Sequence, residues 1–205
     1  MTDKDYLKEI TEIKTIMNRS SRFISLSGLS GILAGIYALI GAIAANFLLM
    51  NYQNSYSDLS ILPISYIEYL LIGIASLVLV LSILTAFILS SRKAKRSGEK
   101  LWDSTSKRLL INFTIPLLTG GAFCIVLYQN GLIGLIAPST LIFYGLACLN
   151  ASKYTLGSIR YLGIINIIIG LIATQFIGYG LYFWALGFGV LHIIYGVLMY
   201  HKYDK

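Results

Sequence analysis

The polar side chains that lie inside long apolar stretches are the residues of this chain best placed to do chemistry. Four of them form our candidate intramembrane polar site: Glu68, Asn112, Asn166 and His192. Polar groups are costly inside a membrane and often mark ion, proton or solute pathways. Glu68 is the only acid within these stretches, and it could bind a cation, carry a proton or orient a polar solute. Alternatively, Glu68 lies near the lipid headgroups, where water solvates it.

Asn166 and His192 lie at similar depths in two consecutive apolar stretches, about 10 Å from their cytoplasmic ends at helical rise. Each falls on the face of its stretch that carries small residues. We therefore expect a hydrogen bond between Asn166 and His192 that joins two neighbouring helices. The alternative is a titratable histidine in a polar cavity, acting as a pH sensor or proton relay.

The sequence lacks the motifs of the common catalytic sites. The chain has only two histidines, His192 and His201, and they do not form the His-Glu-x-x-His pair of zinc hydrolases. It also lacks the Gly-x-Ser-x-Gly elbow of serine hydrolases and the phosphate-binding P-loop. We therefore expect a protein that is not an enzyme and that uses no metal and no cofactor.

Composition places these residues in a membrane protein. Hydrophobic residues make up 57% of the chain and charged residues 12%, against about 45–50% and about 25% in soluble domains. This excludes a soluble enzyme and a nucleic-acid reader. Backbone polar groups must be satisfied inside lipid, so each span must be a helix. The sequence predicts an all-α, polytopic helical bundle with six transmembrane helices at about 23–50, 63–90, 109–128, 131–149, 161–177 and 180–200.

The positive charges predict the orientation of this bundle. All 16 Lys and Arg residues lie outside the six stretches, and they occur only before the first, after the sixth, and in alternate loops. By the positive-inside rule, both termini are cytoplasmic. We expect a multi-pass protein of the bacterial cytoplasmic (inner) membrane. The loop 91–108 holds seven of these charges and could attract anionic lipid headgroups, so the basic charge requires no nucleic-acid partner.

Residues 1–22 are predicted to form a cytoplasmic amphipathic helix ahead of the membrane domain, 23–205. An apolar stripe recurs at spacings of 4, 3 and 4: Tyr6, Ile10, Ile13 and Met17. Charged side chains occupy most of the other faces. Such a helix packs on its own bundle, lies at the headgroups, or provides a docking site for a protein partner.

Small residues at helical spacing predict where the spans pack. The predicted helix-packing residues are Gly31, Gly35, Gly163, Gly170, Gly189 and Gly196. Gly31 and Gly35 are four residues apart, and the other two pairs, Gly163 with Gly170 and Gly189 with Gly196, are seven residues apart. These spacings place both glycines of a pair on one helix face, where another helix can approach closely. We expect these faces to pack within the bundle, and a homo-oligomer interface is the alternative.

Short matches between the spans predict an internal repeat of helical hairpins. Leu71-Ile72-Gly73 matches Leu132-Ile133-Gly134, and Phe143-Tyr144-Gly145 matches Ile194-Tyr195-Gly196. Each unit would leave from the cytoplasm and return, which gives three parallel hairpins around a pseudo-threefold axis. This layout resembles that of the HdeD-like acid-resistance membrane proteins. With Arg19-Ser20-Ser21-Arg22-Phe23-Ile24 at the start of its first span, the chain is also similar to uncharacterised six-span membrane proteins of Bacteroidetes-type bacteria. Neither resemblance implies a catalytic residue.

The expected function follows from how few polar residues the spans hold. We expect a structural, regulatory or stress-related membrane module that acts through helix and loop contacts. The alternative is a channel or transporter for a small, largely uncharged solute, with the four candidate polar residues along its path. A wet pathway normally needs more polar groups than these, which favours the membrane module.

Overall fold

The computed structural model of this chain describes residues 27–54, 64–96, 102–155 and 158–203. This part of the chain is all-helical, without strands, which confirms the predicted all-α class. In chain order its elements are α2 (Gly28–Asn54), α3 (Ile64–Arg96), α4 (Ser104–Gln129), the 3₁₀ turn η2 (Ile133–Leu135), α5 (Ile136–Ala151), α6 (Ile159–Ala173), α7 (Gly180–Trp184), the π-helical turn η3 (Ala185–Val190) and α8 (Leu191–Tyr203). The predicted amphipathic helix at 1–22 lies outside the described residues.

Five helical stretches of the described chain are long and apolar enough to cross a membrane. They are α2, α3, α4, α5 with its preceding 3₁₀ turn, and the continuous α7–η3–α8. The apolar helix α6 has 15 residues, which gives about 22 Å at helical rise, less than the roughly 30 Å of a hydrocarbon core. The span predicted at 161–177 is helical only as far as Ala173. After Ala173 the chain turns, and Gly178 in this turn has a φ of +99°.

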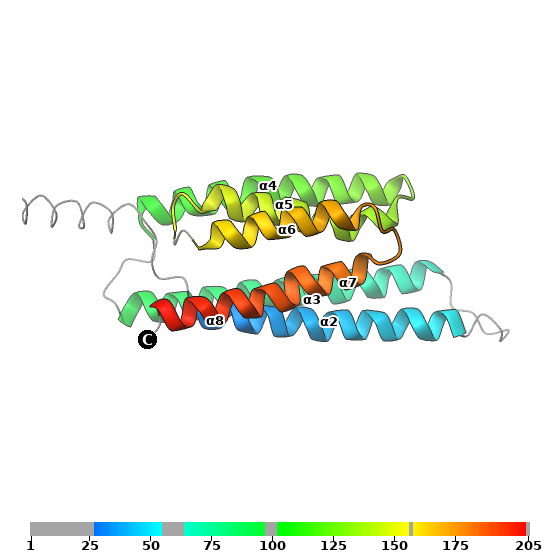
Figure 1. The fold of residues 1–205 in the computed structure, drawn as a ribbon, viewed down its shortest axis with the longest axis horizontal. Helices are drawn as coiled ribbons and strands as arrows, with labels where there is room; N and C mark the ends of the chain where they lie inside the picture. The colour runs from blue at the N-terminus through cyan, green and yellow to red at the C-terminus, as the bar shows by residue number, and fades with distance from the viewer. Residues whose placement is uncertain (1–26, 55–63, 97–101, 156–157, 204–205) are drawn as a thin grey trace, which may run out of the picture.

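The helices form two layers (Figure 1). One layer holds α4, α5 and α6, and the other holds α2, α3 and the continuous α7–η3–α8. The pairs α2–α3 and α4–α5 pack side by side, as the predicted hairpins require. The third predicted hairpin is divided between the layers, since α6 packs mainly on α5 and α8 mainly on α2. The observed packing therefore differs from three hairpins around a pseudo-threefold axis.

Close glycine contacts produce this division. A Cβ atom on Gly163 of α6 would lie 2.7 Å from the carbonyl oxygen of Gly145 in α5. A Cβ atom on Gly35 of α2 would lie 2.6 Å from the carbonyl oxygen of Gly189 in η3. These helices approach so closely that no side chain fits between the backbones. The other predicted packing glycines lie in the same two interfaces: Gly31, Gly170 and Gly196.

A proline inside α4 leaves one backbone carbonyl for α5 to bind. Pro116 has no N–H group, so it cannot donate to the carbonyl of Asn112 four residues earlier. The side chain of Asn150 in α5 donates its Nδ2–H to that carbonyl, with 2.9 Å between nitrogen and oxygen. A hydrogen bond therefore joins α4 to α5 at the point where α4 lacks one of its own.

The first turn of α4 is capped by Asp103. The Asp103 carboxylate accepts hydrogen bonds from both the amide and the hydroxyl of Ser106, each at 2.6 Å. Partial burial alone would raise the pKa of the Asp103 carboxyl, but the hydrogen bonds from Ser106 together outweigh it and lower that pKa below its ordinary value.

We expect the Asp103 cap to make stability depend on pH in acid. A carboxyl with a lowered folded-state pKa stabilises the fold above its unfolded-state pKa, and this contribution disappears as the pH falls through the folded-state pKa. Asp103→Ala should lower the free energy of unfolding by about 1 kcal/mol at pH 7. It should also flatten the acid limb of a thermal-unfolding profile, and an unchanged acid limb would contradict the capping role.

Candidate functional site

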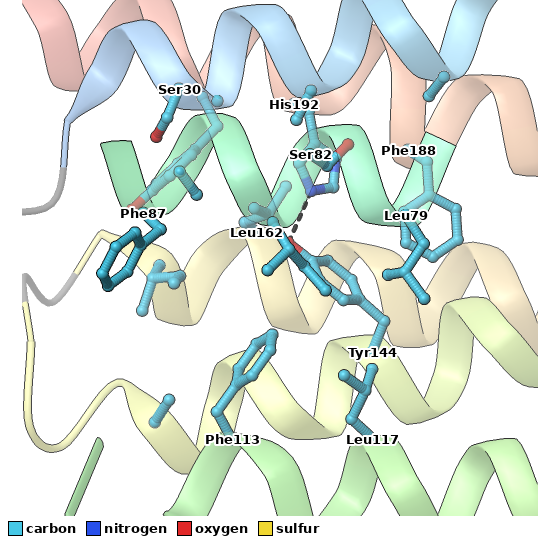
Figure 2. Close-up of a pocket in the computed structure, with 18 of the residues that line it drawn as sticks. Ser30, Leu79, Ser82, Phe87, Phe113, Leu117, Tyr144, Leu162, Phe188 and His192 are labelled. Atoms are coloured by element: carbon cyan, nitrogen blue, oxygen red, sulfur yellow. Dashed lines mark hydrogen bonds between the residues drawn. The ribbon is translucent and has the colours of Figure 1, made fainter. Parts of the chain in front are cut away.

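A cleft of about 690 Å³ lies between the two layers. Residues from α2, α3, α4, α5, α6 and α8 line it, so both layers contribute to its walls (Figure 2). The walls are mainly apolar, with side chains that include Leu79, Phe87, Phe113, Leu117, Leu162 and Phe188. Its volume lies within the roughly 300–1,000 Å³ of typical ligand pockets.

The cleft is open at its side along α3 and α4. Three lining residues of α3, Leu79, Ile83 and Phe87, remain 52%, 55% and 56% exposed. Leu110 of α4 also lines the cleft and is 43% exposed. In a bilayer these apolar side chains would meet lipid, so the cleft would open into the hydrocarbon region and not only into water.

A hydrogen-bonded pair, Tyr144 of α5 and His192 of α8, crosses this apolar space (Figure 2). Their oxygen and Nε2 atoms lie 2.6 Å apart, and the other ring nitrogen of His192, Nδ1, lies 2.9 Å from the carbonyl oxygen of Gly187. A carbonyl can only accept, so Nδ1 carries the proton in a neutral ring and Nε2 accepts from the Tyr144 hydroxyl. The Phe188 ring packs against both, with ring centroids 5.0 Å from Tyr144 and 5.8 Å from His192.

The π-helical turn η3 holds His192 in this position. In a π turn, backbone groups five residues apart come together, and such turns are frequent at functional sites. Gly187 precedes His192 by five residues, which brings its carbonyl under the imidazole ring. A Cβ atom on Gly187 would lie 2.4 Å from the Leu141 side chain and 2.6 Å from Oδ1 of Asn166, so a larger residue here would require both buried side chains to move.

This geometry predicts one histidine tautomer. In ¹⁵N NMR spectra of histidine-labelled protein carrying His201→Gln, we expect His192 as the neutral ring protonated on Nδ1. Tyr144→Phe removes the donor to Nε2, so the Nε2 resonance should move toward the value of a nitrogen without a hydrogen bond. A ring protonated on Nε2 in the wild type would contradict the arrangement.

The predicted hydrogen bond between Asn166 and His192 is wrong, because both nitrogens of His192 have other partners. Asn166 is fully buried in α6, where its Nδ2–H donates to the Leu162 carbonyl of the same helix at 2.9 Å. Its Oδ1 atom has no hydrogen-bond partner among the described residues. Asn166 therefore lies behind Gly187 in the protein interior and does not line the cleft.

The other two candidate residues also lie away from His192. The side chain of Asn112 donates to the Arg108 carbonyl of its own helix at 2.8 Å. Glu68 lies near the start of α3, where its carboxylate accepts a hydrogen bond from the Tyr128 hydroxyl of α4 at 2.9 Å. Among the four predicted site residues, only His192 lines the cleft.

Tyr144 is a residue of the candidate site that the sequence did not predict. Tyrosines are common near membrane surfaces, where they anchor helices. This general rule predicts an anchoring role for the tyrosines and does not single out one in mid-helix. The signal that could have found it is the position of Tyr144, seven residues before the end of α5. Across the described helices, no group of three or more His, Cys, Asp or Glu side chains could hold a metal ion.

Comparison with protein families, with curated proteins and with solved structures found no match to this chain.

Proposed function

We propose that this chain is a six-span protein of the bacterial cytoplasmic membrane with both termini in the cytoplasm. Five long apolar helices support the membrane assignment, and six spans require α6 to cross as well. The basic residues of the described helices support the orientation. They occur where α3 and α8 end and where α4 and α6 begin, and these ends lie together on one side of the bundle (Figure 1).

Within that membrane, the protein acts as a structural or regulatory module that holds a lipid chain in the cleft and carries out no catalysis. The observation that carries this proposal is the apolar cleft of about 690 Å³, which is open at its side. The apolar walls of a cleft of this size can make packing contacts with an acyl chain that enters between α3 and α4.

The same lining gives little support to a channel for a polar solute. Asn112 and Glu68 make their hydrogen bonds outside the cleft, and Asn166 is buried behind it. In the lining, His192 and Tyr144 bind each other. A continuous row of free polar groups, which a hydrated path would need, is therefore not built by these residues.

Filling the cleft with a bulky side chain tests the proposal. Gly121 of α4 lines the cleft, and a Cβ atom there would meet nothing within 4 Å, so Gly121→Trp should fit and occupy the space. Gly73 of α3 is equally open but does not line the cleft, so Gly73→Trp is the matched control.

The readout is native mass spectrometry of protein released from lipid nanodiscs. Wild type and Gly73→Trp should retain bound lipid, and Gly121→Trp should lose most of it. Equal lipid retention by Gly121→Trp and Gly73→Trp would show that lipid binds elsewhere on the bundle. Release of lipid-free wild type under conditions that preserve the fold would overturn the proposal.

A further inference from the structure

One end of the cleft is rich in hydroxyl side chains. Ser30, Ser90, Ser106 and Thr155 line the end where α2 and α4 begin and α3 and α5 end. Toward the opposite end, the lining includes Ala38, Ala75, Leu117, Gly121 and Phe188. Polar side chains also line the rest of the cleft, but Ser82 and Thr140 donate to carbonyls of their own helices, and Tyr144 and His192 bind each other.

Ser90 is the unsatisfied member of the polar end. It is 7% exposed, and its Oγ atom has no hydrogen-bond partner among the described residues. Two of its neighbours in the lining are satisfied, since Ser30 Oγ donates to the Ser27 carbonyl and Ser106 Oγ donates to Asp103. A buried hydroxyl without a partner is costly, so an acceptor entering the cleft at Ser90 would gain a hydrogen bond that the protein does not satisfy itself.

The charge around this end favours an anionic acceptor. The last turn of α3 carries Lys93, Lys95 and Arg96, and the first turns of α4 carry Lys107 and Arg108. These basic residues outnumber the acids described nearby, since Asp103 is the only described carboxylate at this end and Glu68 lies at the far end of α3. A cluster of Lys and Arg at the membrane surface attracts anionic headgroups.

The length of the cleft fits a lipid with its headgroup at this end. The lining residues of α3 run from Ala75 to Ser90, fifteen steps that span about 22 Å at helical rise. One leaflet of the hydrocarbon core is about 15 Å deep, which is half of a roughly 30 Å core. An acyl chain starting at Ser90 would therefore fit within the cleft.

From these observations we infer that the cleft binds an anionic phospholipid of the cytoplasmic leaflet. The Ser90 hydroxyl donates a hydrogen bond to a phosphate oxygen, and an acyl chain extends past Tyr144 and His192 toward Gly121. The inference rests on the proposed lipid-binding function and adds the class and direction of the lipid.

The test uses full-length protein in nanodiscs of equimolar phosphatidylglycerol and phosphatidylcholine with identical acyl chains. Native mass spectrometry then gives the amount of each lipid retained and the ratio of the two. Wild type should retain phosphatidylglycerol preferentially, because the basic residues at this end favour its net negative charge. Both lipids carry a phosphate, so Ser90→Ala should lower the retention of each by about tenfold, the loss expected for one hydrogen bond to a charged group. Ser90→Thr keeps the hydroxyl and should keep the retention.

Ser82→Ala is the matched control. Ser82 lines the same cleft from the same helix, but its hydroxyl donates to the Val78 carbonyl at 2.7 Å, so its removal should leave the amount of lipid retained unchanged. Thermal unfolding of each variant shows whether the fold is retained. An equal effect of Ser82→Ala and Ser90→Ala would overturn the assignment of the phosphate to Ser90.

The remaining outcomes distinguish a failure of this inference from a failure of the proposed lipid-binding function. Retention of both lipids without preference would overturn the anionic class and leave lipid binding intact. Retention of neither lipid would overturn both proposals. Displacement of the lipid by millimolar inorganic phosphate would identify a free phosphate as the true ligand, whereas a ratio unchanged by phosphate supports the phospholipid.

Discussion

Replacing Gly35 with leucine is expected to lower the free energy of unfolding by about 3 kcal/mol, the upper end of overpacking costs. A Cβ atom at Gly35 would lie 2.6 Å from a backbone oxygen of Gly189, and backbone cannot rotate away as a flexible side chain can. The two helices must therefore separate, and the contact that holds α2 against η3 and α8 is lost. Unfolding in a detergent titration, followed by circular dichroism, measures the change.

Gly73→Leu provides the comparison for this substitution. Gly73 also lies within a long apolar helix, but nothing lies within 4 Å of a Cβ atom there. Leucine favours a helix over glycine by up to about 1 kcal/mol, so this variant should be as stable as the wild type or more so. Equal losses in the two variants would mean that the glycine contacts between α2 and α8 do not hold the layer together.

Replacing Asn150 with leucine is the second large effect that we expect, at about 2 kcal/mol. The Asn112 carbonyl then loses the donor from Asn150, and Pro116 has no N–H group that could replace it. An unsatisfied polar group in an apolar environment costs about 1–3 kcal/mol. Thermal unfolding in a fixed detergent gives the loss.

Pro116→Ala tests whether the effect of Asn150→Leu comes from the unsatisfied Asn112 carbonyl. Alanine restores the N–H that can donate to the Asn112 carbonyl within α4, so Asn150→Leu should cost much less in this background. The double-mutant cycle should give a coupling of about 1 kcal/mol between positions 116 and 150. A coupling near zero would show that Asn150 stabilises the protein by packing and not through the Asn112 carbonyl.

The all-α class could be predicted because it depends on composition alone. Long apolar runs must be helical in lipid, and five such helices are present in the described residues. The helix ends could not be predicted in the same way. The span predicted at 161–177 includes Thr174 and Gln175, and α6 ends at Ala173, directly before these two polar residues. Averaged hydropathy over a stretch does not locate the residue at which a helix ends.

The partner of each helix could not be predicted from depth. Counting residues from a helix end gives the height of Asn166 and His192 but not the direction in which each side chain points. That direction depends on which glycine face packs on which helix, and here α6 and α8 pack on different partners. His192 consequently meets Tyr144 of α5, and Asn166 remains bound to its own helix.

Because of the π-helical turn η3, the arrangement of side chains along the last span depends on the number of residues in it. Each residue of an α-helix advances the chain by about 100°, so a turn that holds one residue more rotates everything on one side of it against the other. Deleting a single residue between Ala185 and Val190 would allow a regular helix and would swing Trp184 away from its present place in the cleft wall. The carbonyl that binds His192 would move with it, while hydropathy and charge pattern stayed nearly the same. Two chains with the same membrane topology can therefore differ in whether this cleft is assembled, and one residue of length decides between them.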